Sequence, residues 1–179
     1  AVKCSNYIGH TLDFVSAYGF ENMLLIGNIG KLVKTAAGIM NTHSKVADGR
    51  AEIMAIHAVL NGGDRTAAEI IMDCIITDEM IEVLKKYKIF EKTMDSIAKA
   101  AYKHISSRAG KNVNCGIVMF SEKYGKLCSC GNIERIIGKI KEEKMTTMEG
   151  KKSMRRKRIC EINMVYLCIW VKLKRKRIC

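Results

Sequence analysis

A short apolar run, Met23 to Ile26, constrains the fold of this chain more than any other segment. Four consecutive apolar residues are typical of a strand buried on both faces of a parallel sheet, whose strands are joined by helical crossovers. The sequence AVKC at residues 1–4 reads as the end of an earlier strand, and Ser5 is a plausible N-cap for the helix between the two. The order strand, helix, strand predicts a βαβ unit. The apolar residues with helical spacing in that helix are Ile8, Leu12 and Val15.

Several helices are predicted downstream before the next strand. A helix pattern runs from Gly30 to the polar residues 41–44, and a second runs from Val46 to about Leu60. Thr66 with Glu69 is a capping-box pattern for the next helix. Further helices are predicted from Thr77 and over residues 90–108, the latter closed by Gly110. Residues 113–121 are predicted to be the last strand of the sheet, and residues 132–144 a closing helix.

These elements predict a layered α/β domain over residues 1–144. Three strands are few for such a sheet, so we expect an N-terminal portion of the domain to be missing. Residues 145–179 form a separate basic tail, with 11 Lys and Arg against 2 Asp and Glu, whereas residues 1–144 hold 20 against 16. The formal charge of +13 therefore says little about partners of the body.

The tail allows two interpretations. One is a patch that binds nucleic acid or an anionic lipid surface, and the other is a solvated or poorly folded appendage, which we favour. Its apolar stretch at residues 163–171 is too short to span a bilayer, which needs about 20 helical residues. The eight cysteines include no C-x-x-C pair, so neither a metal site nor a disulfide framework is predicted.

The turn Gly27-Asn28-Ile29-Gly30-Lys31 follows a strand and precedes a helix, where backbone N–H groups can face an anion. Its glycines are too closely spaced for a P-loop, and Leu32 stands where the metal-binding hydroxyl is required. The turn alone fits a ligand site or a tight turn equally well. A nucleotide module remains a weaker alternative.

Cations and polar side chains gather directly after this turn. Residues 30–50 contain four cationic residues against Asp48 alone, which suits a ligand with several carboxylates or phosphates. The competing interpretation is a solvated helix face. His43 lies in a polar stretch, whereas His57 falls on an apolar helix face and is interpreted as a hydrogen-bonded core histidine. The cationic residues are Lys31, Lys34, Lys45 and Arg50.

Longer stretches of the chain resemble a known family, that of the cobalt-precorrin-5B C1-methyltransferases of anaerobic cobalamin biosynthesis, called CbiD. The resemblance runs in order over residues 1–144, and its most specific part is GKLVK-x-AAGIMNTHS-x-VADGR, within residues 24–50. The other stretches are KCSNYIG at 3–9, EIMAIHAVL at 52–60, IMDCIITDEMIEVL at 71–84 and GIVMFSEKYGKL at 116–127.

The resemblance implies the C-terminal half of such an enzyme, with a Rossmann-like three-layer α/β/α sandwich that is incomplete at its N-terminus. It implies a cytoplasmic enzyme that transfers a methyl group from S-adenosylmethionine to C1 of cobalt-precorrin-5B, giving cobalt-precorrin-6A. Whether the chain is active alone and whether it forms homo-oligomers stay open.

The resemblance also implies roles for the residues after the apolar strand. Four of them are expected to orient substrate or cofactor as catalytic residues, namely Asn41, Thr42, His43 and Asp48. The expected cofactor-binding residues are Gly27, Asn28 and Gly30. The cations Lys31, Lys34, Lys45 and Arg50 are expected to pair with the acetate and propionate groups of the tetrapyrrole. No bound metal is expected.

Overall fold

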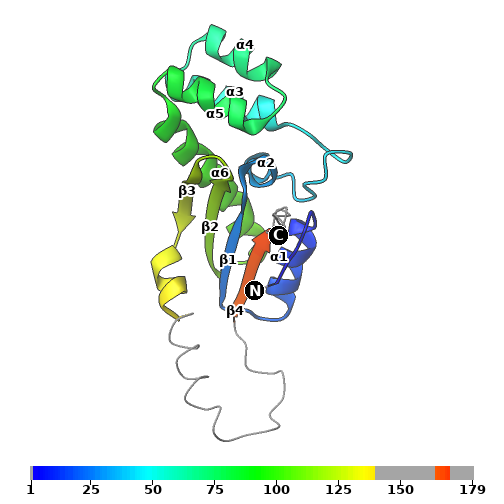
Figure 1. Cartoon of the computed structure of the whole chain (residues 1–179). Helices are drawn as coiled ribbons and strands as arrows, with labels where there is room; N and C mark the ends of the chain where they lie inside the picture. Colours follow the sequence, from blue (N-terminus) through cyan, green and yellow to red (C-terminus); the bar gives the residue numbers. More distant parts are fainter. Residues whose placement is uncertain (1, 140–163, 170–179) are drawn as a thin grey trace, which may run out of the picture.

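The computed structural model describes residues 2–139 and 164–169, the latter by their backbone. Helices and strands form a mixed α/β arrangement, in which a long run of helices separates the first strand from the others (Figure 1). The elements before the long helical region are α1 (Ile8–Ala17), β1 (Asn22–Asn28), α2 (Ile29–Leu32) and the 3-10 helix η1 (Val33–Ala37). Those after it are α3 (Arg50–Leu60), α4 (Arg65–Asp73), α5 (Thr77–Lys86), α6 (Phe90–Ala109), β2 (Asn114–Ser121), β3 (Gly125–Gly131) and β4 (Met164–Ile169).

The sheet has the order β3-β2-β1-β4, with β1 as a central strand (Figure 1). β1 runs parallel to β2, from the pair Asn22 with Asn114 to the pair Asn28 with Phe120. It also runs parallel to β4, and β2 pairs antiparallel with β3. The expectation of a strand buried on both faces is confirmed, because consecutive residues of β1 are almost fully inaccessible to solvent.

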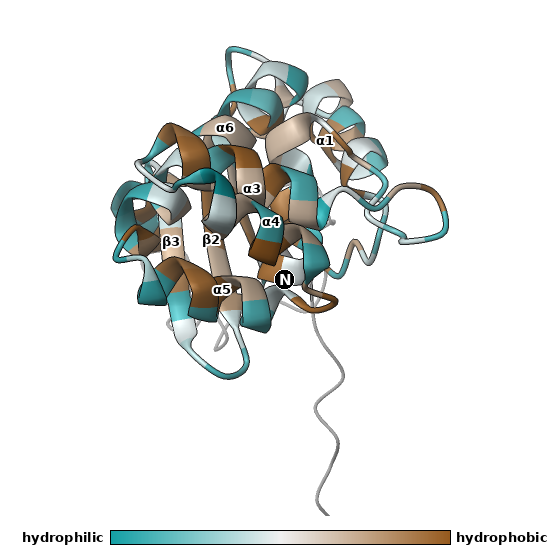
Figure 2. Cartoon of the chain, turned by 90° about the horizontal axis from the view of Figure 1, so that it is seen from above, coloured by the Kyte–Doolittle hydropathy of each residue, from teal (hydrophilic) through white to brown (hydrophobic). Residues whose placement is uncertain are grey.

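A helical cap of α3, α4 and α5 is inserted between β1 and β2 and lies beyond the carboxyl ends of these strands (Figure 1). Seen from above, α4 and α5 carry both apolar and hydrophilic stretches (Figure 2). In α5 the buried residues recur at helical spacing, including Met80, Ile81 and Leu84. α5 therefore buries one apolar face, whereas α3 and the segment after α4 also expose large apolar side chains, including Leu60 and Ile75.

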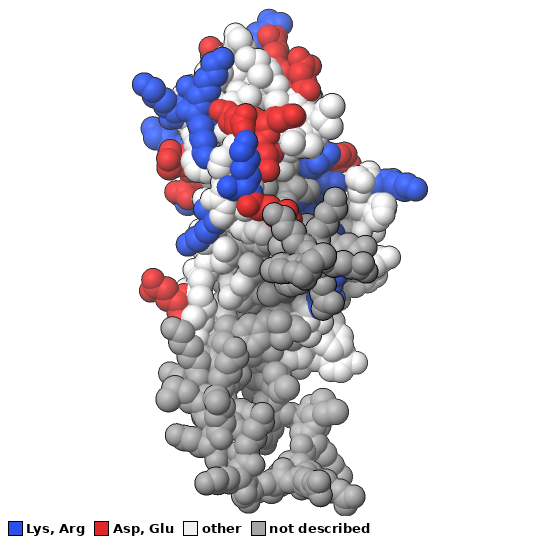
Figure 3. All heavy atoms as spheres, in the orientation of Figure 1, with Lys and Arg blue, Asp and Glu red and all other residues white. Residues whose placement is uncertain are grey.

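Charged side chains of both signs are mixed over the helical cap on the face seen in Figure 3. No large area of one sign is visible among the described residues on that face. The part of the chain that the structure describes also contains no helix that is long and apolar enough to cross a membrane.

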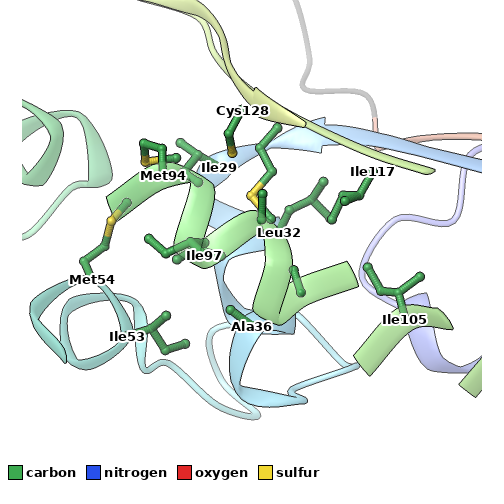
Figure 4. Packing of buried hydrophobic residues seen from close by; sticks show 14 of the residues in the cluster. Ile29, Leu32, Ala36, Ile53, Met54, Met94, Ile97, Ile105, Ile117 and Cys128 are labelled. Carbon is green, nitrogen blue, oxygen red and sulfur yellow. The ribbon is translucent and has the colours of Figure 1, made fainter. Parts of the chain in front are cut away.

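The two faces of β1 pack against different helices. Met23 and Leu25 belong to the main core with residues of α1, α6 and η1. Figure 4 shows part of this core, including Ala36 and Ile105. Leu24 points to the other face, where it packs on Ile136 of the helical residues 133–139. Gly116 allows this close approach, since a Cβ atom there would lie within 3.1–3.2 Å of Leu24, Ile133 and Ile136 side chains.

The N-terminal segment differs from its prediction. Val2 makes only an isolated bridge and residues 3–4 lie outside any strand, so the strand predicted to end at residue 4 is not found among the described residues. Ser5 has a φ of 52° and is not the N-cap, a position that Tyr7 takes instead. This difference arises from tertiary contacts. The turn at Ser5 lets the backbone of residues 6–7 pair with residues 41–42.

The helix predicted from Gly30 is shorter than expected. It becomes 3-10 after Leu32 and ends at Gly38, whose φ of 77° is left-handed. The next helix begins at Arg50 rather than Val46. In the following helix the N-cap is Asp64, whose Oδ1 accepts from the Ala67 N–H at 2.8 Å, so the predicted capping box at Thr66 is wrong.

The prediction that residues 113–121 are the last strand is also wrong. β3 follows β2 as the second strand of a hairpin, although its sequence GKLCSCG lacks the β-branched residues typical of strands. β4 lies within the segment expected to be an appendage. The predicted helix at 132–144 is present over residues 133–139, and residues 140–144 lie outside the described part of the chain.

Candidate functional site

A pocket of about 350 Å³ lies beyond the carboxyl end of β1, where the chain passes into α2. Open α/β sheets bind ligands at the carboxyl ends of their strands, close to the point where neighbouring connections run in opposite directions. Three separate segments form the pocket: residue 6, residues 30–34 and residues 42–50. The lining residues are Asn6, Gly30, Lys31, Lys34, Thr42, His43, Ser44 and Arg50.

Asn6 joins the first segment to the other two. Its side-chain oxygen accepts from Lys31 Nζ at 2.8 Å and from Thr42 Oγ1 at 3.5 Å. Its backbone carbonyl accepts from the Thr42 N–H at 3.0 Å, and the adjacent Tyr7 forms a bridge with Asn41. Asn6 therefore fixes the position of the Lys31 ammonium and of the buried Thr42 hydroxyl.

Lys34 is buried, with 2% of its surface exposed. Its Nζ donates to the Ala47 carbonyl oxygen at 2.8 Å and to the Thr42 carbonyl oxygen at 3.4 Å. It also lies 3.6 Å from Asp48 Oδ1. Of the three N–H donors of the ammonium, two are used by these carbonyl oxygens, and Asp48 adds an ion-pair contact. Lys34 thus holds the loop of residues 42–48 against η1.

Asp48 and Arg50 form a bidentate pair. Arg50 Nε donates to Asp48 Oδ1 and its Nη2 donates to Asp48 Oδ2, each at 2.8 Å. The guanidinium holds the pKa of the Asp48 carboxyl down at about 2. Asp48 Oδ1 also accepts from the Gly49 N–H at 3.1 Å. These bonds orient the start of α3 and use two N–H groups of Arg50, which also lines the pocket.

This pair predicts an acid-dependent loss of stability. Because the folded-state pKa of Asp48 lies below its ordinary value of 3.8, its contribution is present above that value and is lost as the pH falls toward 2. Asp48 is exposed and Arg50 is partly exposed, so we expect the pair to contribute less than about 1 kcal/mol to the free energy of unfolding. Urea denaturation of the wild type and of Asp48→Asn at pH 6 and pH 2.5 measures it. The difference in unfolding free energy should shrink at the lower pH, and a constant difference would contradict this account.

His43 is exposed at the mouth of the pocket. Its Nδ1 accepts from the Lys45 N–H at 3.1 Å, which places the proton of the neutral ring on Nε2. Its own N–H donates to Asn41 Oδ1 at 3.2 Å. The ring therefore offers a hydrogen-bond donor at Nε2, while Asn41 stabilises the turn.

The glycine turn at residues 27–31 is occupied by contacts within the protein. Gly27 is a buried strand residue whose backbone pairs with Met119 and Ile169. Asn28 Oδ1 accepts from the Gly30 N–H at 2.8 Å, which caps α2. A Cβ atom at Gly30 would lie 3.2 Å from that oxygen. The Gly30 N–H is thus already paired, and the turn offers it to no anion.

The structure brings together six of the predicted site residues, Gly30, Lys31, Lys34, Thr42, His43 and Arg50. The others, Gly27, Asn28, Asn41, Lys45 and Asp48, do not line the pocket. Asn6 was not predicted, because its only signal was its place in the family-like stretch at residues 3–9. Ser44 was not among the predicted site residues either, yet it lines the pocket.

His57 lies away from the pocket, on α3. It is half buried, with Nδ1 2.8 Å from Ser96 Oγ, and burial lowers its pKa. This arrangement agrees with a hydrogen-bonded core histidine. Within the described residues, no group of three or more His, Cys, Asp and Glu side chains is placed to hold a metal ion.

Fold and site together define an open α/β domain with a cation-lined pocket at the carboxyl end of its central strand. A family model described as CbiD, C-terminal domain, matches residues 41–131. The chain belongs to this family. The match includes the loop of residues 42–50 and the cap, and ends with β3.

Curated relatives carry the name cobalt-precorrin-5B C(1)-methyltransferase. The protein of Ruminiclostridium cellulolyticum is 43% identical over 121 residues, which are 68% of this chain and 32% of the relative. That of Alkaliphilus metalliredigens is 34% identical over 142 residues, 79% of this chain and 37% of the relative. This chain thus spans about a third of the length of the relatives that it matches. No solved structure matches it.

Proposed function

We propose that this chain is the C-terminal part of a cobalt-precorrin-5B C1-methyltransferase. In this proposal residues 1–144 belong to a Rossmann-like three-layer domain, residues 145–179 are an additional basic tail, and the enzyme acts in the cytoplasm. The supporting observation is that the family match begins at Asn41 and includes the loop that forms one wall of the cation-lined pocket. The described residues offer no observation that favours nucleic-acid or lipid binding instead.

The substrate proposed for this pocket is a reduced cobalt tetrapyrrole with acetate and propionate side chains. Charge-assisted hydrogen bonds to carboxylates are the strongest that a surface pocket offers, and Arg presents a planar fork of donors for them. Lys31 uses one donor on Asn6, and Arg50 uses two on Asp48, so both keep N–H groups for a ligand. These two cations are our proposed carboxylate-binding residues.

Lys34 and Asp48 have a different role in this proposal. Lys34 is enclosed by carbonyl oxygens and Asp48, and Asp48 is held by Arg50. They position the loop and the guanidinium and do not touch the substrate. Lys45 is exposed and does not line the pocket, so it contributes at most long-range attraction.

The reaction proposed is methylation of C1 to give cobalt-precorrin-6A, with S-adenosylmethionine as methyl donor. Transfer of a methyl group to carbon is an in-line displacement, so holding the reacting atoms in position contributes more than proton transfer. Thr42 and the Nε2–H of His43 are placed to orient a polar group of the substrate at the pocket mouth.

The glycine turn does not fit the methyl donor as a cradle. Gly27 is buried and paired in the sheet, and the Gly30 N–H is taken by Asn28. We therefore derive no step from these three residues. In this proposal Gly27, Asn28 and Gly30 support the pocket structurally and do not bind the methyl donor.

The activity test is incubation of the purified chain with S-adenosylmethionine and cobalt-precorrin-5B, followed by mass detection of cobalt-precorrin-6A. The same reaction is run with the preceding two thirds of the Ruminiclostridium relative supplied as a second polypeptide. Product above a no-enzyme control in either reaction supports the proposal. Absence of product in both, with the full-length relative active in parallel, would contradict it.

A binding measurement tests the pocket separately. Lys31→Ala should weaken binding of cobalt-precorrin-5B about tenfold in calorimetry, because one charge-assisted contact is lost. Lys45→Ala is the matched control, with the same change of charge outside the pocket, and should bind within about twofold of wild type. Equal losses in the two variants would show a diffuse charge effect and count against this pocket.

A further inference from the structure

The two parallel neighbours of β1 come from very different parts of the chain. β2 follows β1 after the helical cap and α6, whereas β4 comes from residues 164–169, beyond the family match. Six consecutive residue pairs join β1 to β4, from Asn22 with Met164 to Gly27 with Ile169. A strand from outside the family region thus completes one side of the central strand.

The handedness of the sheet connections predicts which strand would lie at the position of β4. The helix α1 leads into β1, and α6 leads from the cap into β2; both pack on the sheet face that carries Met23 and Leu25. Connections between parallel strands are right-handed in nearly all proteins. When two successive right-handed connections pack on the same face, each new strand is added on the same side of the previous one. A strand that enters α1 therefore lies beside β1 on the side away from β2, which is where β4 lies (Figure 1).

We propose that the outer edge of β1 is an acceptor surface for a parallel apolar strand, and that residues 164–169 are its internal donor. The donor takes the position that a strand entering α1 would occupy. This proposal does not depend on the proposed enzymatic activity.

The chemistry of both strands suits this pairing. β1 is apolar on both faces, and an open edge beside it would leave backbone N–H and C=O groups unpaired next to the core. The donor sequence MVYLCI has no charge and is rich in residues with high β-propensity. Addition of an extended segment to a sheet edge is a common mode of peptide recognition, with affinity from main-chain hydrogen bonds.

The acceptor edge also supports the candidate site. Ile169 pairs with Gly27, and the next residue, Asn28, caps the helix that carries Lys31. Loss of the donor would therefore loosen the base of the pocket.

Hydrogen exchange of a chain lacking residues 145–179 tests the proposal. Within residues 22–28, the amides directed at β4, which are every second one along the strand, should exchange at least tenfold faster than in the full chain, because β1 loses that partner. Amides of residues 114–121 should change much less, since β2 keeps both neighbours. A synthetic peptide of residues 162–171, added to the truncated chain, should restore protection of residues 22–28, and a scrambled peptide should not.

Two sets of full-length variants keep the test decisive if the truncated chain does not fold. Replacing Lys174, Arg175, Lys176 and Arg177 with Gln removes tail charge and keeps the donor, so protection should stay at the wild-type level. Tyr166→Pro and Leu167→Pro are made separately, and at one of these adjacent positions proline removes an N–H directed at β1. Wild-type protection of residues 22–28 in both proline variants, or the same loss in the Gln variant, would overturn the proposal.

Discussion

Replacement of Lys34 by Met is expected to lower the free energy of unfolding by about 2–4 kcal/mol, because it leaves buried acceptors without a partner. Met matches the length of the lysine stem but supplies no N–H donor. The Ala47 and Thr42 carbonyl oxygens would lose their contacts of 2.8 and 3.4 Å, and Asp48 would lose a cation at 3.6 Å. For a domain with a total stability of about 5–15 kcal/mol this is a large fraction.

Urea denaturation measures this loss, and limited proteolysis shows where it acts. Cleavage within residues 43–47 should become faster, since the buried ammonium holds that loop on η1. Lys45→Met, an exposed position in the same loop, should change stability by less than about 0.5 kcal/mol. A Lys34→Met protein with wild-type stability and impaired tetrapyrrole binding would reverse our assignment and make Lys34 a ligand residue.

Lys34 also shows why the sequence predicted the site only in part. Charge counting over residues 30–50 found every cation, but it could not separate a buried ammonium from an exposed one. Lys34 and Lys45 look alike in the sequence, yet one is enclosed and the other lies in solvent. The difference arises from the turn at Gly38, which returns the loop over η1.

Asn6 was missed for a related reason. Its side chain meets Lys31 and Thr42 across 25 and 36 residues of sequence. Local periodicity carries no information on such contacts. The isolated bridge between Tyr7 and Asn41 lies beside these contacts and likewise joins segments far apart in the sequence.

Elements with strong local patterns were predicted well. The strand at residues 23–26 lies within β1, and the helix predicted over residues 90–108 is α6, which ends at Ala109 before Gly110. β3 had no such pattern, because Cys, Ser and Gly dominate it. β4 had an apolar pattern, but its charged surroundings favoured an appendage. Its pairing depends on β1, more than 130 residues earlier in the chain.

Gly131→Ala should be among the most destabilising single substitutions, with an expected loss of about 3 kcal/mol or more. Gly131 ends β3 and precedes the helical residues 133–139, which cover the second face of the sheet. Its φ is 93°, a region that L-residues rarely adopt. A Cβ atom there would lie 2.4 Å from the Cys115 carbonyl oxygen and 2.6 Å from Tyr102. The first of these is backbone of β2, so the sheet itself must shift.

Gly125→Ala separates backbone strain from steric clash. Gly125 begins the same strand with a φ of 69°, but a Cβ atom there meets nothing within 4 Å. It should therefore cost only the strain of the left-handed conformation, about 1–2 kcal/mol. Thermal and urea denaturation of the two variants give the comparison, and near-equal losses would contradict the clash at Cys115. Because that clash lies between β2 and the start of the covering helix, Gly131→Ala should also speed hydrogen exchange in residues 114–121, whereas Gly125→Ala should leave it close to wild type.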